Sequence, residues 1–123
     1  MTDVTGFGLL GHLSEMCEAS NLSAKINFDK VPLLGKSVID YYLAEGCVPG
    51  GTNRNYASYG HKIGQLSDYQ RNILCDPQTS GGLLVAVEST YIAEFLSITN
   101  AEGLALEALG QFEKTGKHLI EIV

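Results

Sequence analysis

Residues 2–13, TDVTGFGLLGHL, join a glycine-rich loop to the start of an apolar helix. From Leu9 to Cys17, apolar residues recur at helical spacing, which predicts an amphipathic helix. The loop places Asp3 just ahead of this helix, where a metal ion or a phosphate could meet side-chain oxygens and free backbone N–H groups. In the alternative interpretation, Asp3 or Thr5 only caps the helix and the glycines allow close packing.

Helix-like and strand-like segments alternate along the rest of the chain. Further helices are expected at residues 36–45, at residues 68–74 with Asp68 as the N-cap, and from Ser89 onward. Strands are expected at residues 24–28, 83–87, 109–112 and 118–123. The continuously apolar 83–87 segment predicts a buried strand, and the last two strands are expected to form a hairpin. This order predicts one domain, residues 1–123, of the α/β (α+β) class, with a mixed sheet and helices packed on it.

Residues 47–66 show little periodicity and predict a long loop or a set of turns. Within them, residues 49–55, PGGTNRN, place two glycines next to an arginine. Backbone N–H groups at such glycines can converge on an anion, and Arg54 could add a bidentate contact. The residues expected to face phosphate or substrate are Gly51, Thr52, Arg54 and Asn55. The alternative is an exposed turn whose arginine is solvated.

A third glycine-rich motif, DPQTSGG at residues 76–82, leads directly into the 83–87 segment. Both a turn with glycines at positive φ and a ligand contact are consistent with it. The histidines lack metal-ligand spacing to one another, and His12, within the first helix, is expected to be a capping or packing residue and not a catalyst. The cysteines lack a histidine partner in the sequence, so no catalytic nucleophile is assigned.

The composition excludes several classes of protein. Eight Lys and Arg stand against fourteen Asp and Glu, a formal charge of −6 with no basic block, which argues against general binding to nucleic acid. No apolar run approaches the roughly 20 residues that a membrane span needs. Cys17, Cys47 and Cys75 are odd in number and form no CxxC motif, so neither a disulfide framework nor a zinc site is expected. The expected location is the reducing cytoplasm.

In this order and at these separations, TDVTGFGLLGHL, PGGTNRN and DPQTSGGLL closely resemble the C-terminal half of the selenophosphate synthetases (selenide, water dikinases). That family belongs to the aminoimidazole ribonucleotide synthetase superfamily. The similarity covers nearly the whole chain and is strongest from Thr2 to Val87. It implies a layered, partly ferredoxin-like C-terminal domain that sits on an N-terminal ATP-binding domain, in an enzyme that forms a homodimer.

The resemblance also implies an activity. The full enzyme converts selenide, ATP and water into selenophosphate, AMP and phosphate with Mg²⁺, and so supplies selenoprotein and selenium-modified tRNA synthesis. In the family, the aspartate of TDVTGFG is a magnesium ligand at the ATP phosphates, and that position is Asp3 here. The reactive cysteine or selenocysteine, its lysine partner and the other metal-binding aspartates belong to the N-terminal half, which this chain lacks.

Two expectations follow for the isolated chain. A single aspartate cannot hold a Mg²⁺ cluster in water, because Mg²⁺ gives up its hydration shell reluctantly, so the chain alone is expected to be inactive. Removing the partner domain is expected to leave an apolar face exposed, which favours self-association or marginal solubility.

Two other functions stay open at this point. The chain could be a stand-alone, non-catalytic module of the same fold for binding or assembly; an in-frame N-terminal domain encoded upstream would exclude this. It could also belong to a superfamily member with another substrate, in purine synthesis, hydrogenase maturation or thiamine phosphate phosphorylation. The combination of TDVTGFGLLGHL with DPQTSGGLL favours the selenium branch.

Overall fold

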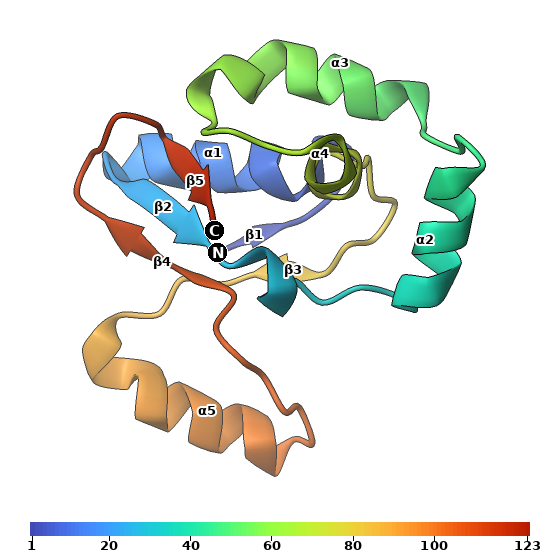
Figure 1. Ribbon diagram of the computed structural model, residues 1–123. Coiled ribbons are helices and arrows are strands. Elements are labelled where there is room, and N and C mark those ends of the chain that lie inside the picture. The colour runs from blue at the N-terminus through green and yellow to red at the C-terminus, as the bar shows by residue number, and fades with distance from the viewer.

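The computed structural model describes residues 1–123 and contains two small sheets with helices around them (Figure 1). The α-helices are α1 (Gly8–Ser20), α2 (Lys36–Ala44), α3 (Gly50–Tyr59), α4 (Asp68–Leu74) and α5 (Ile92–Ala101). Short 3-10 turns are η1 (Phe28–Lys30), η2 (Gly60–Lys62) and η3 (Ser89–Tyr91). The strands are β1 (Thr2–Asp3), β2 (Ser23–Ile26), β3 (Leu83–Leu84), β4 (Gly110–Glu113) and β5 (Ile120–Ile122). The predicted α/β class with a mixed sheet is confirmed.

The three-stranded sheet has β2 at its centre, with β4 antiparallel on one side and β5 parallel on the other. Ala24 of β2 lies opposite Phe112 of β4 and Ile120 of β5. The predicted hairpin is therefore wrong, because β4 and β5 pair with β2 and not with each other. Ala24 and Ile26 are buried, so both edges of β2 need backbone partners, and each C-terminal strand provides them on one side.

The hydrophobic core lies where α1 meets the sheet, α3 and α4. Leu10, Leu13 and Cys17 recur on one face of α1 and are buried. They belong to one hydrophobic cluster with Ile120 of β5 and Leu74 at the end of α4. The amphipathic helix predicted from the spacing of apolar residues is thus confirmed.

A capping box begins α4. The Ser67 hydroxyl accepts a hydrogen bond from the Gln70 backbone N–H, and the Gln70 side chain accepts one from the Ser67 N–H. Asp68, the predicted N-cap, is instead the first helical residue, although the predicted extent of the helix is confirmed. Ser67 takes the cap position because Gln70, three residues later, completes the reciprocal pair of bonds.

Residues 47–66 contain a ten-residue helix, so the prediction of a long loop or a set of turns is wrong. The buried residues of α3 are Thr52, Asn55 and Tyr59. Because two of these three residues are polar types, no apolar periodicity marks the helix in the sequence. Figure 1 shows α3 lying along α1, with which it is in contact.

The predicted buried strand at residues 83–87 is also wrong. Only the two residues of β3 are in strand conformation, and they pair antiparallel with β1 alone. Leu83 and Val85 expose 67% and 39% of their surface. The helix expected from Ser89 is present as η3 and α5, but α5 has no buried residue and stands apart from the other elements (Figure 1).

None of the helices combines the length and the apolar character that a membrane crossing would require.

Candidate functional site

The first and third glycine-rich motifs run side by side in opposite directions. The Val4 N–H donates to the Gly82 carbonyl oxygen at 2.8 Å, and the Val4 carbonyl oxygen accepts from the Gly81 N–H at 2.9 Å. One residue further on, the Thr5 carbonyl oxygen accepts from the Gln78 N–H at 3.1 Å. The two motifs, far apart in the sequence, therefore form a short backbone ribbon.

Helix α3 brings the second motif against one end of this ribbon. The Asn55 Nδ2 atom donates to the carbonyl oxygens of Gly6, at 2.9 Å, and of Cys75, at 3.0 Å. One helical turn later, the Tyr59 hydroxyl donates to the Phe7 carbonyl oxygen at 2.7 Å. The four consecutive carbonyl groups from Val4 to Phe7 thus each accept a hydrogen bond from α3 or from the third motif.

Two glycines make this close approach possible. An ideal Cβ on Gly51 would lie 2.8 Å from Cγ of Pro77, and one on Gly81 would lie 2.8 Å from the Val4 carbonyl oxygen. Real Cβ atoms do not come so close to other heavy atoms, so larger residues at either position would push the motifs apart.

Asp3 lies at the opposite end of the ribbon, in β1, where it pairs with Leu83. Its side chain is exposed. A carboxylate is the kind of hard oxygen ligand that Mg²⁺ prefers. No group of three His, Cys, Asp or Glu residues in the structure could hold a metal ion. Asp3 can therefore contribute one ligand to a metal site, and the chain does not form a complete site by itself.

Comparison with known proteins identifies the family. Residues 1–122 match the family model described as "AIR synthase related protein, C-terminal domain". The chain belongs to this family. It is 58% identical over 123 residues to the "Selenide, water dikinase" of Sulfurimonas denitrificans and 59% identical over 124 residues to that of Aeromonas hydrophila subsp. hydrophila.

The protein of the same name from Pseudomonas putida is 57% identical over 123 residues. Each of these alignments covers 100% of this chain and 35% of the relative, so the chain spans 35% of the length of these curated relatives. The resemblance to the selenophosphate synthetases is thus confirmed.

Within this AIR synthase related domain, the second motif is the start of a helix and not a flexible turn. Gly51 packs against Pro77, and Thr52 is fully buried. Asn55 is turned inward to its two carbonyl partners, and Arg54 is exposed. The role of these four residues in facing phosphate stays a prediction, and Arg54 is the one whose side chain can meet an anion without rearrangement.

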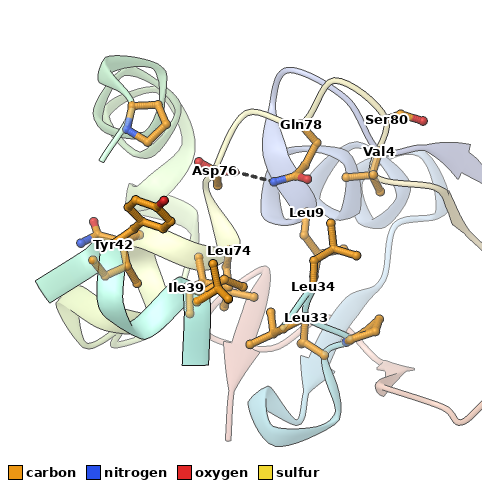
Figure 2. A pocket seen from close by; sticks show the side chains of 18 of the residues that line it. Val4, Leu9, Leu33, Leu34, Ile39, Tyr42, Leu74, Asp76, Gln78 and Ser80 are labelled. Atoms are coloured by element: carbon orange, nitrogen blue, oxygen red, sulfur yellow. Dashed lines mark hydrogen bonds between the residues drawn. The ribbon is translucent and has the colours of Figure 1, made fainter. Parts of the chain in front are cut away.

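Two polar side chains of the third motif join the site without having been predicted there. Gln78 Nε2 donates to Asp76 Oδ2 at 2.5 Å. Burial raises the pKa of the Asp76 carboxyl, while the neighbouring Thr52 and Gln78 side chains act in the opposite direction. Figure 2 shows this pair at the edge of a mainly apolar groove of about 630 Å³, which Leu9 and Tyr42 help to line. The signal in the sequence was the motif itself, for which a ligand contact was one of two interpretations, but nothing singled out Asp76 or Gln78 within it.

The cysteine thiols and the His12 ring show no features of catalytic groups. Burial raises the pKa of Cys17 to about 11 and also raises that of Cys75, so both stay protonated near neutral pH. All three cysteines are free, and only Cys47 is exposed. His12 is buried in α1, with Nε2 3.2 Å from the Thr5 hydroxyl oxygen, which confirms its predicted packing role.

Proposed function

We propose that this chain is the C-terminal domain of a selenide, water dikinase, which makes selenophosphate from selenide, ATP and water with AMP and phosphate as the other products. The observation that carries the proposal is the 58% and 59% identity over the whole chain to proteins of that name. The mutual contacts of the three motifs support it. Since the chain spans 35% of the length of those relatives, the proposed activity belongs to a longer protein. The 123-residue chain alone is expected to be inactive.

In this proposal, Asp3 supplies one carboxylate oxygen to Mg²⁺ at the ATP phosphates. Mg²⁺ is commonly held by one or two carboxylates together with waters and phosphate oxygens, and it neutralises the charge of the phosphoryl group during transfer. The exposed position of Asp3 makes its carboxylate accessible to such a complex. The remaining protein ligands would come from the rest of the longer protein, because the chain has no group of three suitable side chains.

The proposal includes an N-terminal ATP-binding domain as the partner of this domain, in a cytoplasmic homodimer. Apolar side chains on and beside α5 support a covering partner, because Tyr91, Ile92 and Ile98 are all exposed. Several exposed large apolar side chains on one otherwise uncovered helix are consistent with an interaction surface. The three free cysteines fit a reducing compartment.

The proposal is tested by Asp3→Asn in the full-length protein, with ATP-dependent selenophosphate formation as the readout. We expect at least about a tenfold loss of activity, because even groups that only support a metal ligand are commonly worth that much. Asp29→Asn is the matched control, since Asp29 is also exposed and the change in charge is the same. Unchanged activity in the Asp3 variant would refute the metal role, and turnover of aminoimidazole precursors or thiamine phosphate in place of selenide would refute the substrate.

A further inference from the structure

Two backbone acceptors meet at the junction of the first and third motifs. The carbonyl oxygens of Gly6 and Cys75 both lie within hydrogen-bond distance of Asn55 Nδ2, at 2.9 and 3.0 Å. Two carbonyl groups cannot bond to each other, so the direct backbone bonding of the ribbon cannot continue here. A side-chain amide nitrogen carries two hydrogens and can satisfy both acceptors at once.

The junction between the two motifs is partly closed to water, which limits what else could bind these carbonyl groups. Asn55 exposes only 8% of its surface and Cys75 is fully buried, so water cannot readily replace the amide at the Cys75 carbonyl oxygen. Tyr59, one turn along the same face of α3, exposes 7% and donates to the next carbonyl group, that of Phe7. α3 therefore holds two consecutive carbonyl groups of the loop that joins Asp3 to α1.

We propose that Asn55 and Tyr59 are positioning residues for the Asp3 loop: α3 joins this loop to the third motif and so fixes where the Asp3 carboxylate stands. The proposal rests on the proposed metal role of Asp3. In this proposal both residues act through the backbone, by donating to the carbonyl oxygens of Gly6, Cys75 and Phe7. Asn55 is one of the residues of the second motif that were expected to face phosphate. In the structure its side chain cross-links the first motif to the segment that leads into the third.

The chemistry of the side chain makes the proposal specific. An alanine at position 55 would leave the buried Cys75 carbonyl oxygen without a donor, and it would also remove the donor to the more exposed Gly6 carbonyl oxygen. A carboxylate there would face both oxygens with like partial charge and could donate only when protonated. The pKa of a carboxyl introduced by Asn55→Asp should therefore rise in the folded state. Folding of that variant should then weaken as the pH rises through this pKa, a dependence that loss of packing alone would not produce.

The experiment uses the full-length protein with Asn55→Ala, Asn55→Asp and Tyr59→Phe, and with Asn53→Ala as the control from the exposed face of α3. Hydrogen exchange is measured at the amides of Val4, Gln78 and Gly81, which bridge the two motifs. In the Asn55 variants we expect exchange at these amides to accelerate at least about fivefold, with a smaller effect for Tyr59→Phe, which keeps the ring. The control should exchange as the unmodified protein does.

The second readout is the Mg²⁺ concentration that gives half-maximal selenophosphate formation. We expect it to rise about tenfold in Asn55→Ala and to stay unchanged in Asn53→Ala. Unchanged exchange, or an unchanged Mg²⁺ requirement in a folded Asn55→Ala protein, would overturn the positioning role. Tyr59→Phe, which removes only one hydroxyl, provides the same comparison if the Asn55 variants do not fold. Failure of the proposed metal role of Asp3 would be recognised differently, because the Asp3→Asn variant would then keep normal activity.

Discussion

An ideal Cβ on Gly8 would lie 2.8 Å from the carbonyl carbon of Cys75, which is too close for any side chain. Gly8 also has a φ of +72°, in the left-handed region that residues with a Cβ rarely adopt. The first motif thus turns into α1 against the backbone that leads into the third motif. Both the turn and the close contact require glycine at this position.

Gly8→Ala is therefore expected to destabilise the fold. The left-handed conformation alone costs a residue with a Cβ about 1–2 kcal/mol, and the contact with Cys75 adds to this cost. The free energy of unfolding, measured in urea, is expected to fall by at least that amount. Gly6→Ala is the control, because Gly6 has no positive φ and no atom within 4 Å of its ideal Cβ. Equal stability of the two variants would contradict this account of Gly8.

Leu74 tests where the core lies. It is fully buried at the end of α4 and belongs to the hydrophobic cluster with α1 and β5. Leu74→Ala should lower the free energy of unfolding by about 2–5 kcal/mol, since it removes apolar contacts and leaves a cavity. Leu34→Ala, at a side chain that is 92% exposed, should change it by less than about 0.5 kcal/mol. If both substitutions lowered the free energy of unfolding by similar amounts, Leu74 of α4 would not be packed in the core.

Helix α1 could be predicted from the sequence because its buried residues are apolar and recur every three or four positions. Helix α3 could not, because it buries Thr52 and Asn55 for hydrogen bonding and close packing. Hydrophobic periodicity finds elements that contribute apolar surface to a core. It does not find a helix whose buried side chains are polar and bind the backbone carbonyl groups of neighbouring segments.

The sheet shows a second limit of sequence analysis. Residues 110–113 and 120–122 are apolar in part and separated by a turn-like segment, which is the pattern of a hairpin. Their actual partner is β2, and Ser23 of β2 pairs with Glu113, which lies 90 residues later in the chain. Local pattern identified the strands but not their pairing, because pairing depends on which edges of β2 are free.

The three motifs that were singled out in the sequence do meet, through backbone bonds and through the Asn55 side chain. The metal role of Asp3, whose side chain is exposed, stays a prediction. The role of Asn55 could not be read from glycine-rich sequence, because nothing local indicates that two carbonyl groups from distant segments converge on it. Asp76 was missed for the same reason, since its burial depends on the packing of α3 against the third motif.

Thiol labelling should distinguish the three cysteines. Cys47 is exposed, whereas Cys17 and Cys75 are buried and burial raises the pKa of each thiol. Reaction of the native chain with a thiol reagent at pH 8 should modify one cysteine rapidly, and all three should react after unfolding. Cys47→Ser should remove the rapid reaction. Rapid modification of two or more cysteines in the native protein would show that α1 or α4 opens.

The stability of the domain should depend on the charge of Asp76. Burial raises its pKa in the folded state above the unfolded value, so the ionised carboxylate opposes folding at neutral pH. This destabilisation is lost as the pH falls from the pKa of Asp76 in the folded state to its lower pKa in the unfolded state, because the carboxyl becomes protonated. Asp76→Asn should therefore stabilise the protein at pH 7 relative to the unmodified chain, and the difference should shrink toward low pH. If bonds from Gln78 outweighed burial, Asp76→Asn would instead destabilise the protein at pH 7.

The exposed face of α5 should make the isolated 123-residue chain self-associate. α5 has no buried residue, and Ile92 and Ile98 expose 46% and 59% of their surface. Apolar surface removed from water contributes about 25 cal/mol per Å², so contact between two such helices favours association. Sedimentation velocity should show a concentration-dependent increase in mass, which Ile92→Glu with Ile98→Glu reduces and Leu34→Glu, far from α5 in the chain, does not. Because a partner domain would cover α5, the full-length protein should bind an apolar dye more weakly per chain than the isolated domain does. Equal dye binding per chain would place the partner domain elsewhere.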